Sequence, residues 1–546
     1  MIRNWFKSGT PWIWLNAGAV SIALVAVFGL LLLIMFRGMS HFWPANVESF
    51  HYVNDQQTMT VIAEVVESET VPSESVPGIT SATGEVTRYL VKTGNRDILG
   101  SDFKWIYDQK LETREQPSEV MVLERIEWGN FYGYLNAVYE NSSLISNDEN
   151  KWSVFNLRLE RALDIREQIL DLEKGDIGAI NYRLERLRLN KRSLQLDDEY
   201  TDDAANEIEQ ERTVLKAQYA ELLKLTAKLY EDINRDSIRA TIMDGREITI
   251  PLEKIVKVWQ PNKMNVLDKI VFYFKSLWAF VTEEPREANT EGGIFPAIFG
   301  TVMMVMLMSV MVTPFGVVAA VYLREYAQQG AIIRVIRIAV NNLAGVPSIV
   351  YGVFGLGFFV YFLGGSIDAL FYPEALPGPT FGTPGLLWSS LTLALLTLPV
   401  VIVATEEGLS RIPRALREGS MALGATKIET LWRVVLPMAS PAIMTGLILA
   451  IARAAGEVAP LMLVGVVKLA PSLPLDGNMP FLHLDRKFMH LGFHFYDVGF
   501  QSPNVEAARP LFYATAFLLV LVIVALNLSA ISLRNKLREK YRALDN

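Results

Sequence analysis

The chain has 546 residues, of which 51% are hydrophobic and 20% charged, and its mean hydropathy is +0.24. Because the charge is concentrated in one long middle segment, this composition is typical of a membrane protein that carries a soluble insert. The chain has no cysteine, which excludes disulfides, thiolate metal sites and cysteine nucleophiles. The net charge of −8 averages over unlike segments and indicates no partner. No G-x-x-x-x-G-K-S/T loop occurs, so we do not expect ATP hydrolysis by this chain.

Six apolar stretches are long enough to cross a bilayer, which takes about 20 helical residues. They lie at 12–36, 293–323, 336–364, 386–405, 438–467 and 510–533. Basic residues collect before the first stretch, after the second, after the fourth and after the sixth: Arg3, Lys7, Arg324, Arg334, Arg337, Arg411, Arg414, Arg417, Lys427, Arg433, Arg534, Lys536, Arg538, Lys540 and Arg542. The positive-inside tendency then predicts that both termini are cytoplasmic. We expect the first stretch to be a retained span, with a cleaved signal peptide as the alternative.

This topology places residues 38–290 outside the cytoplasm as one long insert between the first two spans. Short runs near the two ends of the insert predict strands at 58–66, 85–91, 119–126 and 238–250. The last run contains Asp244-Gly245, a pair typical of two-residue hairpin turns. We therefore predict a small β-domain that is assembled from both ends of the insert.

Between these strands, a heptad pattern predicts a long antiparallel coiled-coil hairpin at about 157–234. Its first arm has a seam with steps of four and three: Leu159, Leu163, Arg166, Leu170, Glu173, Ile177, Ile180, Leu184, Leu187, Lys191 and Leu194. After an aspartate-rich turn, the second arm continues with Ile208, Leu215, Leu222 and Leu229. The hairpin is either a passive spacer or a docking arm for an unknown periplasmic partner, and the residues favour neither.

A last segment of the insert, residues 266–281, is apolar and aromatic but carries Asp268, Lys269 and Lys275. At 16 residues it is too short to cross a bilayer. We predict an interfacial helix at about 265–282, and a buried helix of the insert is the alternative.

Two charged side chains, Arg453 and Glu457, lie well inside an apolar stretch. An ionised group at mid-bilayer costs about 2.5–3.5 kcal/mol, so it normally faces a protein interior or a water path and has a partner. Their spacing of four residues predicts that both lie on one face of a helix. They are the candidates for lining a substrate path, and a purely structural ion pair is the alternative.

The polar segment 418–437 separates the fourth and fifth stretches and reads EGSMALGATKIETLWRVVLP. It resembles the E-A-A-x-x-x-G-x9-I-x-L-P loop of ATP-binding-cassette importer permeases, with departures at Gly419, Ser420 and Val434. The resemblance implies a short cytoplasmic helix that lies in a groove of an ATPase subunit and transmits its closure to the spans. The residues that it assigns to ATPase coupling are Glu418, Gly419, Ser420, Gly424, Ala425, Val434, Leu436 and Pro437.

Three further segments, 342–352, 398–407 and 452–460, resemble phosphate-importer permeases of the PstA type, and this likeness covers about 293–540. It implies the six-span fold of type-1 ABC importer permeases and a role in phosphate translocation for Arg453 and Glu457. Val458 departs from the family, which has Thr there. The assignment suits the chemistry, because a guanidinium presents planar paired donors to phosphate oxygens.

The same resemblance implies a PstC-type permease partner, a PstB-type ATPase dimer that uses ATP and Mg, and a PstS-type periplasmic phosphate-binding protein. It implies a multi-pass protein of the bacterial inner membrane that contacts lipid and does not bind nucleic acid. Such a protein is not an enzyme and itself binds no cofactor or metal. The predicted fold class is an α-helical polytopic membrane protein with a periplasmic α+β insert. The domain plan is a tail and first span at 1–37, the insert at 38–290, the permease domain at 291–534 and a cytoplasmic tail at 535–546.

Two alternative functions stay open: a permease for another oxyanion such as sulfate, molybdate or tungstate, and a periplasmic scaffold or phosphate-sensing component that acts through its coiled coil. Asn341, Asn342, Ser348 and Tyr351 at the start of the third span favour helix packing over path lining. His483, His490 and His494 cluster in the last external loop, but a metal site there is the less favoured interpretation.

Overall fold

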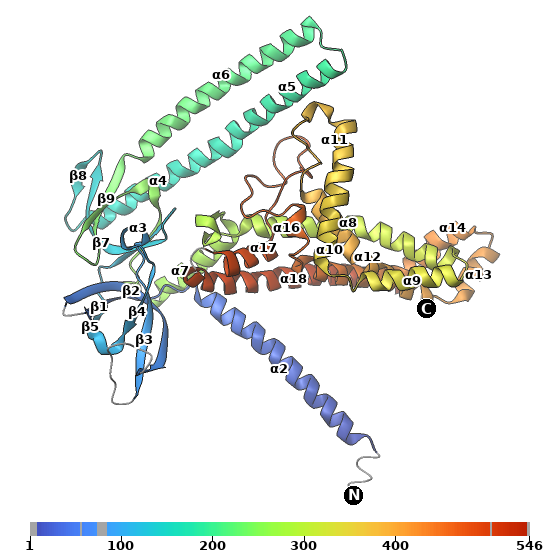
Figure 1. The fold of residues 1–546 in the computed structure, drawn as a ribbon, viewed down its shortest axis with the longest axis horizontal. Coiled ribbons are helices and arrows are strands. Elements are labelled where there is room, and N and C mark those ends of the chain that lie inside the picture. Colours follow the sequence, from blue (N-terminus) through green and yellow to red (C-terminus); the bar gives the residue numbers. More distant parts are fainter. Residues whose placement is uncertain (1–7, 55–56, 74–83, 503–504, 543–546) are drawn as a thin grey trace. The chain divides into compact units, whose positions relative to one another are not determined.

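The computed structural model describes residues 8–54, 57–73, 84–502 and 505–542. Arg3 and Lys7, counted above among the basic residues, lie outside this part. The chain divides into two compact units (Figure 1). The insert unit comprises Phe42–Gly293 and Pro373–Leu376, and the membrane unit comprises Met1–His41, Ile294–Tyr372 and Pro377–Asn546.

Within the described ranges, the membrane unit has six helices long and apolar enough to cross a membrane: Pro11–Ser40, Phe295–Tyr326, Ser348–Phe371, Leu386–Arg411, Lys427–Gly456 and Ala508–Lys536. Its helices are α2 (Thr10–Ser40), α8 (Phe295–Val321), α9 (Ala331–Leu343), α10 (Ser348–Phe354), α11 (Gly365–Phe371), α12 (Leu386–Arg411), α13 (Arg414–Ala422), α14 (Lys427–Thr430), α15 (Leu436–Gly456), α16 (Leu461–Val464), α17 (Leu491–Tyr496) and α18 (Val505–Arg542). π-helical turns prolong or join several of them, at Tyr322–Tyr326, Gly355–Gly364, Leu431–Val435 and Asp497–Gln501.

Helix α12 is the centre of the membrane unit and packs against α8 and α15. Small residues allow this close approach: a Cβ atom on Gly408 would lie 2.4 Å from the Ala442 Cβ, and one on Gly446 would lie 2.7 Å from the Ala404 Cβ. The hydroxyl of Thr397 donates to the Leu393 carbonyl at 2.8 Å, so the polar group is satisfied inside the helix. Small residues and internally bonded hydroxyls are what helix packing in lipid requires.

Two predicted spans have wrong bounds. The third span begins at Ser348 rather than 336, because α9 ends at Leu343 and Pro347 interrupts the chain before α10. The residue before a proline is disfavoured in the helical region, so 336–364 is not one helix. The fifth span ends at Gly456 rather than 467, and Glu457 is already extended.

The insert unit contains two antiparallel sheets. The first has the order β4-β3-β2-β1-β5, and the second has the order β10-β9-β7-β6-β11 with β8 paired to β7. Val47 and Ile62 of the first sheet form one buried cluster with Val122 and Tyr132 of the second. The strands are β1 (Val47–Asn54), β2 (Gln57–Pro72), β3 (Glu85–Lys92), β4 (Phe103–Tyr107), β5 (Leu111–Glu115), β6 (Met121–Arg125), β7 (Asn130–Glu140), β8 (Ser143–Ser146), β9 (Asp236–Thr241), β10 (Glu247–Pro251) and β11 (Ile255–Trp259).

The four predicted strand runs coincide with β2, β3, β6 and the β9–β10 hairpin. The loop of that hairpin covers residues 242–246, so it is longer than the predicted two-residue turn, and Gly245 adopts φ 82° in it. The run at 58–66 underestimates β2, which continues to Pro72 because its outer half pairs with β3. Strands β1, β4, β5, β7, β8 and β11 were not predicted.

The hairpin consists of α4 (Lys151–Asp171), a π-helical turn (Leu172–Ile177) and α5 (Gly178–Leu196) on one arm, and α6 (Asp202–Ile233) on the other. Figure 1 shows α6 running beside α4 and α5, and all of these helices share contacts. Thr201 caps α6, because its hydroxyl accepts from the Ala204 N–H at 3.3 Å.

The first part of the predicted heptad seam is right at Leu159 but wrong at Leu170. The buried residues of α4 are Phe155, Leu159, Ala162, Ile165 and Ile169, whereas Leu170 is exposed. These side chains pack into the core of the second sheet together with Ile233. The π-helical turn contains one residue more than an α-helical turn and so rotates the buried face of the arm. After this turn, the buried residues Ile177 and Ile180 are again those of the predicted seam. The first half of the arm is therefore part of the β-domain.

Three short elements complete the insert unit: α3 (Arg96–Leu99), α7 (Val266–Thr282), and a small ladder between β12 (Pro285–Arg286) and β13 (Glu291–Gly292). Helix α7 coincides with the segment predicted as an interfacial helix. Its start is fixed by a capping box, in which Asn265 and Asp268 each accept a backbone N–H of the other.

Candidate translocation pair and coupling loop

The candidate charged pair lies where the fifth span breaks. Arg453 is in the last turn of α15, and Glu457 follows its end with φ −79° and ψ 135°. Pro460 disfavours the helical conformation at the residue before it. The backbone of Pro460 also packs tightly against Gly352 of α10, where an added Cβ would lie only 2.7 Å from the Pro460 Cα. The short helix α16 then resumes at Leu461. Inside a membrane such a break is tolerated where protein or a water-filled path surrounds it.

Arg453 and Glu457 form one loose ion pair. The Arg453 Nε lies 3.6 Å from the Glu457 Oε1, and the two side chains are 33% and 21% exposed. This separation exceeds hydrogen-bonding distance, and within the described ranges neither side chain makes a hydrogen bond. The expectation that both lie on one helical face is wrong, since the helix ends at Gly456. They meet because the extended backbone at Glu457 turns its carboxylate back toward the last helical turn.

A buried charged residue of the third span was missed. Asp368 in α11 is buried, and its carboxylate accepts from the Phe381 N–H at 2.8 Å and the Gly382 N–H at 2.6 Å. The predicted third span ended at 364, so this residue lay outside it. Two backbone donors satisfy the carboxylate, so Asp368 holds the loop after α11 in place and is not a candidate for contact with substrate.

Tyr351 was predicted to support helix packing, with lining of the substrate path as the alternative. Its hydroxyl donates to the Leu343 carbonyl at 2.7 Å and so joins the start of α10 to the end of α9. This hydrogen bond favours the packing interpretation.

The candidate coupling loop has two short helices joined by a tight turn. Gly424 has φ +90°, a conformation that side chains with a Cβ rarely adopt, and it lets the chain reverse between α13 and α14. Thr426 and Glu429 form a capping box that starts α14. The departure at Ser420 is compensated, because its hydroxyl lies 2.9 Å from the Thr430 hydroxyl and joins the two helices.

Arg417 holds the loop against the spans. Its guanidinium donates to the carbonyls of Ile412 and Leu409 at 2.6 and 2.8 Å, and lies 2.9 Å from the carboxylate of Glu325. Lys427 donates to the Glu325 carbonyl at 2.5 Å. Displacement of α13 would therefore be transmitted to the end of the second span and to α12.

The predicted coupling residues occupy three different places. Glu418, Gly419 and Ser420 lie on α13, whereas Gly424 and Ala425 form the turn. Val434, Leu436 and Pro437 lie further on, at the base of the fifth span, where a π-helical turn precedes Pro437. Pro437 lies at the start of α15 and is accommodated by the wider π-helical turn that precedes it.

The loop also exposes an apolar face that the sequence analysis missed. Leu423 is 91% exposed and Trp432 is 75% exposed, and three more apolar side chains are exposed with them: Leu416, Met421 and Ile428. Large apolar side chains that gather at the surface of a charged loop indicate a binding surface. The signal was present in the sequence, because these residues are apolar within an otherwise polar segment.

The three histidines of the last loop do not gather into one site. His483 contacts the Asp476 carboxylate at 2.9 Å, whereas His490 accepts from the Gly492 N–H at 3.1 Å. Burial lowers the pKa of His490 to about 3 and that of His494 to about 4, so both are neutral at physiological pH. Across the described ranges, no group of three or more His, Cys, Asp or Glu side chains could hold a metal ion.

Comparison with known proteins agrees with this fold. Residues 312–542 match the family of binding-protein-dependent transport system inner membrane components. The chain is 39% identical over 236 residues to the phosphate transport system permease protein PstA of Mycobacterium leprae, covering 43% of this chain and 70% of that protein. It is 31% identical over 239 residues to the probable ABC transporter permease protein YqgH of Bacillus subtilis, covering 43% of this chain and 72% of that protein.

Among solved structures, an inward-facing form of the MetNI methionine ABC transporter is 19% identical, with a TM-score of 0.33 over 48% of this chain and 98% of that one. The six helices that are long and apolar enough to cross a membrane fit a polytopic membrane permease. The chain belongs to the family of binding-protein-dependent transport system inner membrane components, as a permease of the PstA type.

Proposed function

We propose that this chain is the transmembrane permease subunit of an ATP-driven phosphate importer in the bacterial inner membrane. The PstA-type relatives support the substrate class, since the Mycobacterium leprae protein is named for phosphate transport. The observation that carries the proposal is the loose Arg453–Glu457 pair at the break in the fifth span. The subunit forms the path with a PstC-type partner, whose relatives also resemble this chain.

In this proposal, phosphate and Glu457 compete for Arg453. The guanidinium presents paired N–H donors that fit two phosphate oxygens, and its contact with Glu457 is too long to hold it firmly. When phosphate arrives, it displaces the carboxylate. When phosphate leaves, Glu457 pairs with Arg453 again and prevents an uncompensated charge in the spans. The pair thus binds phosphate transiently during its passage and is not a high-affinity binding site.

The α13–α14 loop would receive the movement of the ATPase. Its exposed apolar residues, above all Leu423 and Trp432, fit a groove on a PstB-type ATPase dimer, which binds ATP and Mg and hydrolyses the nucleotide. Glu418, Gly419 and Gly424 lie on the exposed part of the loop, whereas Ser420 joins its two helices and Arg417 joins α13 to the second span. This chain itself is a transport subunit and not an enzyme.

The basic residues after the second, fourth and sixth spans support an orientation with both termini in the cytoplasm. The insert at about 38–290 would then lie in the periplasm, on the side from which a PstS-type phosphate-binding protein delivers its cargo. Its long helical hairpin would be a coiled-coil arm for a periplasmic partner or a spacer.

A scaffold or sensing role for the hairpin is testable by shortening it. Residues 157–234 should not be removed as a whole, because Leu159, Ile165 and Ile233 belong to the core of the β-domain. Replacing 176–222 by a short flexible linker keeps that core. Normal phosphate uptake by the shortened chain would support the permease proposal, whereas loss of the phosphate-starvation response alone would assign sensing to the hairpin.

The proposed function is tested by uptake of radiolabelled phosphate in cells that lack their own importer and receive the full subunit set. Excess unlabelled sulfate, molybdate or tungstate is added in parallel. We expect uptake that depends on this chain and is suppressed only by unlabelled phosphate. Uptake of another oxyanion in place of phosphate would overturn the substrate assignment.

A further inference from the structure

Helix α7 presents a continuous apolar face to its surroundings. Phe274 is 62% exposed and Trp278 is 72% exposed, and Leu267 and Val271 are exposed on the same side. Their spacing of four, three and four residues places all of them on one face of the helix. The described surface therefore includes a row of large apolar side chains nearly the full length of the helix.

The opposite face of α7 is firmly packed within the insert unit. Phe280 is buried, and its ring lies 5.1 Å from that of Phe42. The Lys257 ammonium donates to the Ser276 hydroxyl at 2.7 Å and lies 3.7 Å from the Phe272 ring centre. These contacts fix the rotation of the helix, so the apolar face cannot turn inward without losing them.

The start of the insert contacts α7 directly. The ring of Trp43 lies 6.1 Å from that of Tyr273, and Lys269 donates to the Asn46 side chain at 2.5 Å. Trp43 comes three residues after Ser40, the last residue of the first span. The inner face of α7 is thus held at the place where the chain leaves the membrane.

The end of the insert contacts α7 as well. The Glu284 carbonyl, just beyond the helix, accepts from the Gly293 N–H at 3.0 Å, and a Cβ on Gly293 would lie 2.2 Å from the Glu283 carbonyl oxygen. Gly293 comes two residues before Phe295, where the second span begins. Helix α7, together with the two residues that follow it, therefore contacts both ends of the insert that join the membrane spans.

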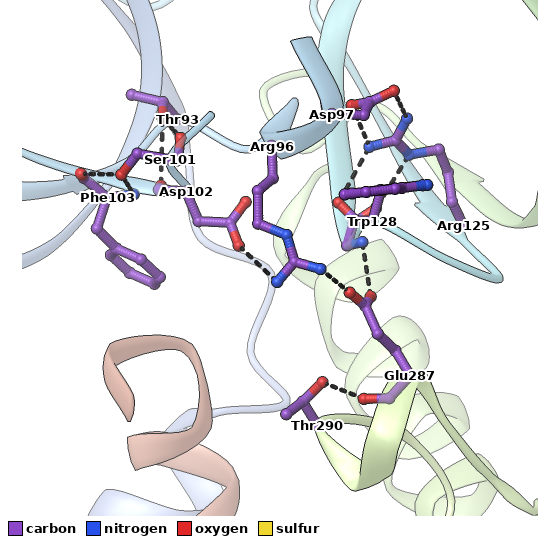
Figure 2. A network of polar contacts seen from close by, with 11 residues as sticks. Thr93, Arg96, Asp97, Ser101, Asp102, Phe103, Arg125, Trp128, Glu287 and Thr290 are labelled. Atoms are coloured by element: carbon purple, nitrogen blue, oxygen red, sulfur yellow. Dashed lines mark hydrogen bonds and ion pairs between the residues drawn. The ribbon is translucent and has the colours of Figure 1, made fainter. Parts of the chain in front are cut away.

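A polar network fixes the short connection between α7 and the second span (Figure 2). Glu287 pairs with Arg96 and accepts from the Gly129 N–H at 2.8 Å. Arg125 binds Asp97 through two hydrogen bonds of 2.9 and 3.0 Å behind this contact. The connection is thereby tied to the β-domain, and the end of α7 cannot move away from the membrane junction independently.

We propose that α7 lies in the membrane interface, with Leu267, Val271, Phe274 and Trp278 inserted among the lipid acyl chains beside the headgroups. At 17 residues it is too short to span, but its exposed apolar face suits burial about 5–10 Å deep. Trp278 suits this depth, and Lys275 beside the face reaches the headgroups. Lipid is the occupant because α7 is held against both junctions with membrane spans, where lipid surrounds the protein.

The absence of cysteine from the chain permits a direct test. Phe274→Cys in the complete importer, placed in nanodiscs of phosphatidylethanolamine and phosphatidylglycerol, is labelled with an environment-sensitive nitrobenzoxadiazole fluorophore. Val214→Cys on α6 is the matched control, because it is also an exposed apolar residue of a helix in the insert unit. The unsubstituted chain in the same complex gives the labelling background of the other subunits.

We expect the probe at 274 to emit at shorter wavelength than the probe at 214, to be quenched by lipids that carry a nitroxide near the headgroup, and to resist aqueous iodide. The probe at 214 should show the reverse. Iodide quenching at 274 equal to that at 214 would overturn the proposal, because the face would then be in water. Protection from both quenchers would also overturn it, because a protein would then cover α7.

Discussion

One charged cluster in the insert unit and one charged pair in the membrane unit are bound to very different degrees. In the insert unit, buried Asp236 contacts three arginines, Arg158, Arg161 and Arg235, at 2.5 to 3.1 Å. In the membrane unit, Arg453 and Glu457 share one contact of 3.6 Å. A charge that maintains architecture is saturated with partners, whereas a charge that exchanges partners during transport must be left loosely bound. The Asp236 cluster thus satisfies its own charges, whereas the Arg453–Glu457 pair leaves contacts open for another molecule.

The exposed apolar face of the coupling loop gives the largest expected effect. Trp432→Asp should abolish phosphate uptake, because a carboxylate would have to be desolvated in the ATPase groove, while membrane insertion stays normal. Trp432→Phe keeps an apolar ring and is the matched control. Uptake and co-purification of the ATPase are the measurements, and full uptake by the aspartate variant would remove this face from the coupling surface.

Breaking the saturated network should cost stability rather than transport chemistry. Asp236→Asn leaves three arginines without their shared carboxylate, so the insert unit should lose about 3 kcal/mol of unfolding free energy. Protease resistance of the insert in the full chain, followed against urea concentration, measures this loss. Glu209→Gln removes an exposed pair with Arg212 and should change little. Equal effects of the two substitutions would show that the buried Asp236 cluster contributes no more stability than an exposed ion pair.

Two glycines of the coupling loop should respond with opposite signs. Gly424→Ala introduces a Cβ at φ +90° and should destabilise the loop by about 1 kcal/mol. Gly419 lies in α13 with open space around its Cα, so Gly419→Ala should stabilise the helix by up to about 1 kcal/mol. Hydrogen exchange of residues 414–430 reports both changes. Matching shifts for the two variants would show that the turn does not depend on the left-handed conformation.

The smallest effect concerns pH. Burial raises the pKa of Glu291 from 4.5 to about 7, against the opposing charge of Lys92. The folded insert therefore holds a proton that the unfolded chain releases, and the resulting stability is present below about pH 4.5 and is lost as pH rises through about 7. Glu291→Gln should flatten this dependence. Hydrogen exchange of β13 across that range is the measurement, and an unchanged slope in the variant would exclude Glu291 as its source.

The sequence predicted those parts in which local pattern and tertiary structure agree. The six spans were predicted from apolar length, although Pro347 and Gly456 moved two of their ends. Four strand runs and the hairpin were predicted from periodicity, but β4 and β5 are short, and β5 pairs with the distant β1. The seam failed at Leu170 because sheet packing, and not a partner helix, decides which face of α4 is buried.

Of the candidate sites, the charged pair was predicted from residue type and spacing, and the coupling loop from the resemblance of residues 418–437 to a family pattern. The end of α15 at Gly456 was not, since an Arg and a Glu four residues apart suggest a continuous helix. The role of Ser420 could not be predicted either, because its partner Thr430 is brought near only by the turn at Gly424.

The central claim is that a loosely held Arg453 passes phosphate along the path. Its most direct test is phosphate uptake by the complete importer carrying Arg453→Gln, with Arg453→Lys as the charge-conserving control and with assembly and ATPase activity measured in parallel. We predict that the glutamine variant assembles but does not import, and that the lysine variant imports more slowly because it lacks the paired donors. Uptake at the wild-type rate by the glutamine variant would contradict the claim and leave the pair a structural one.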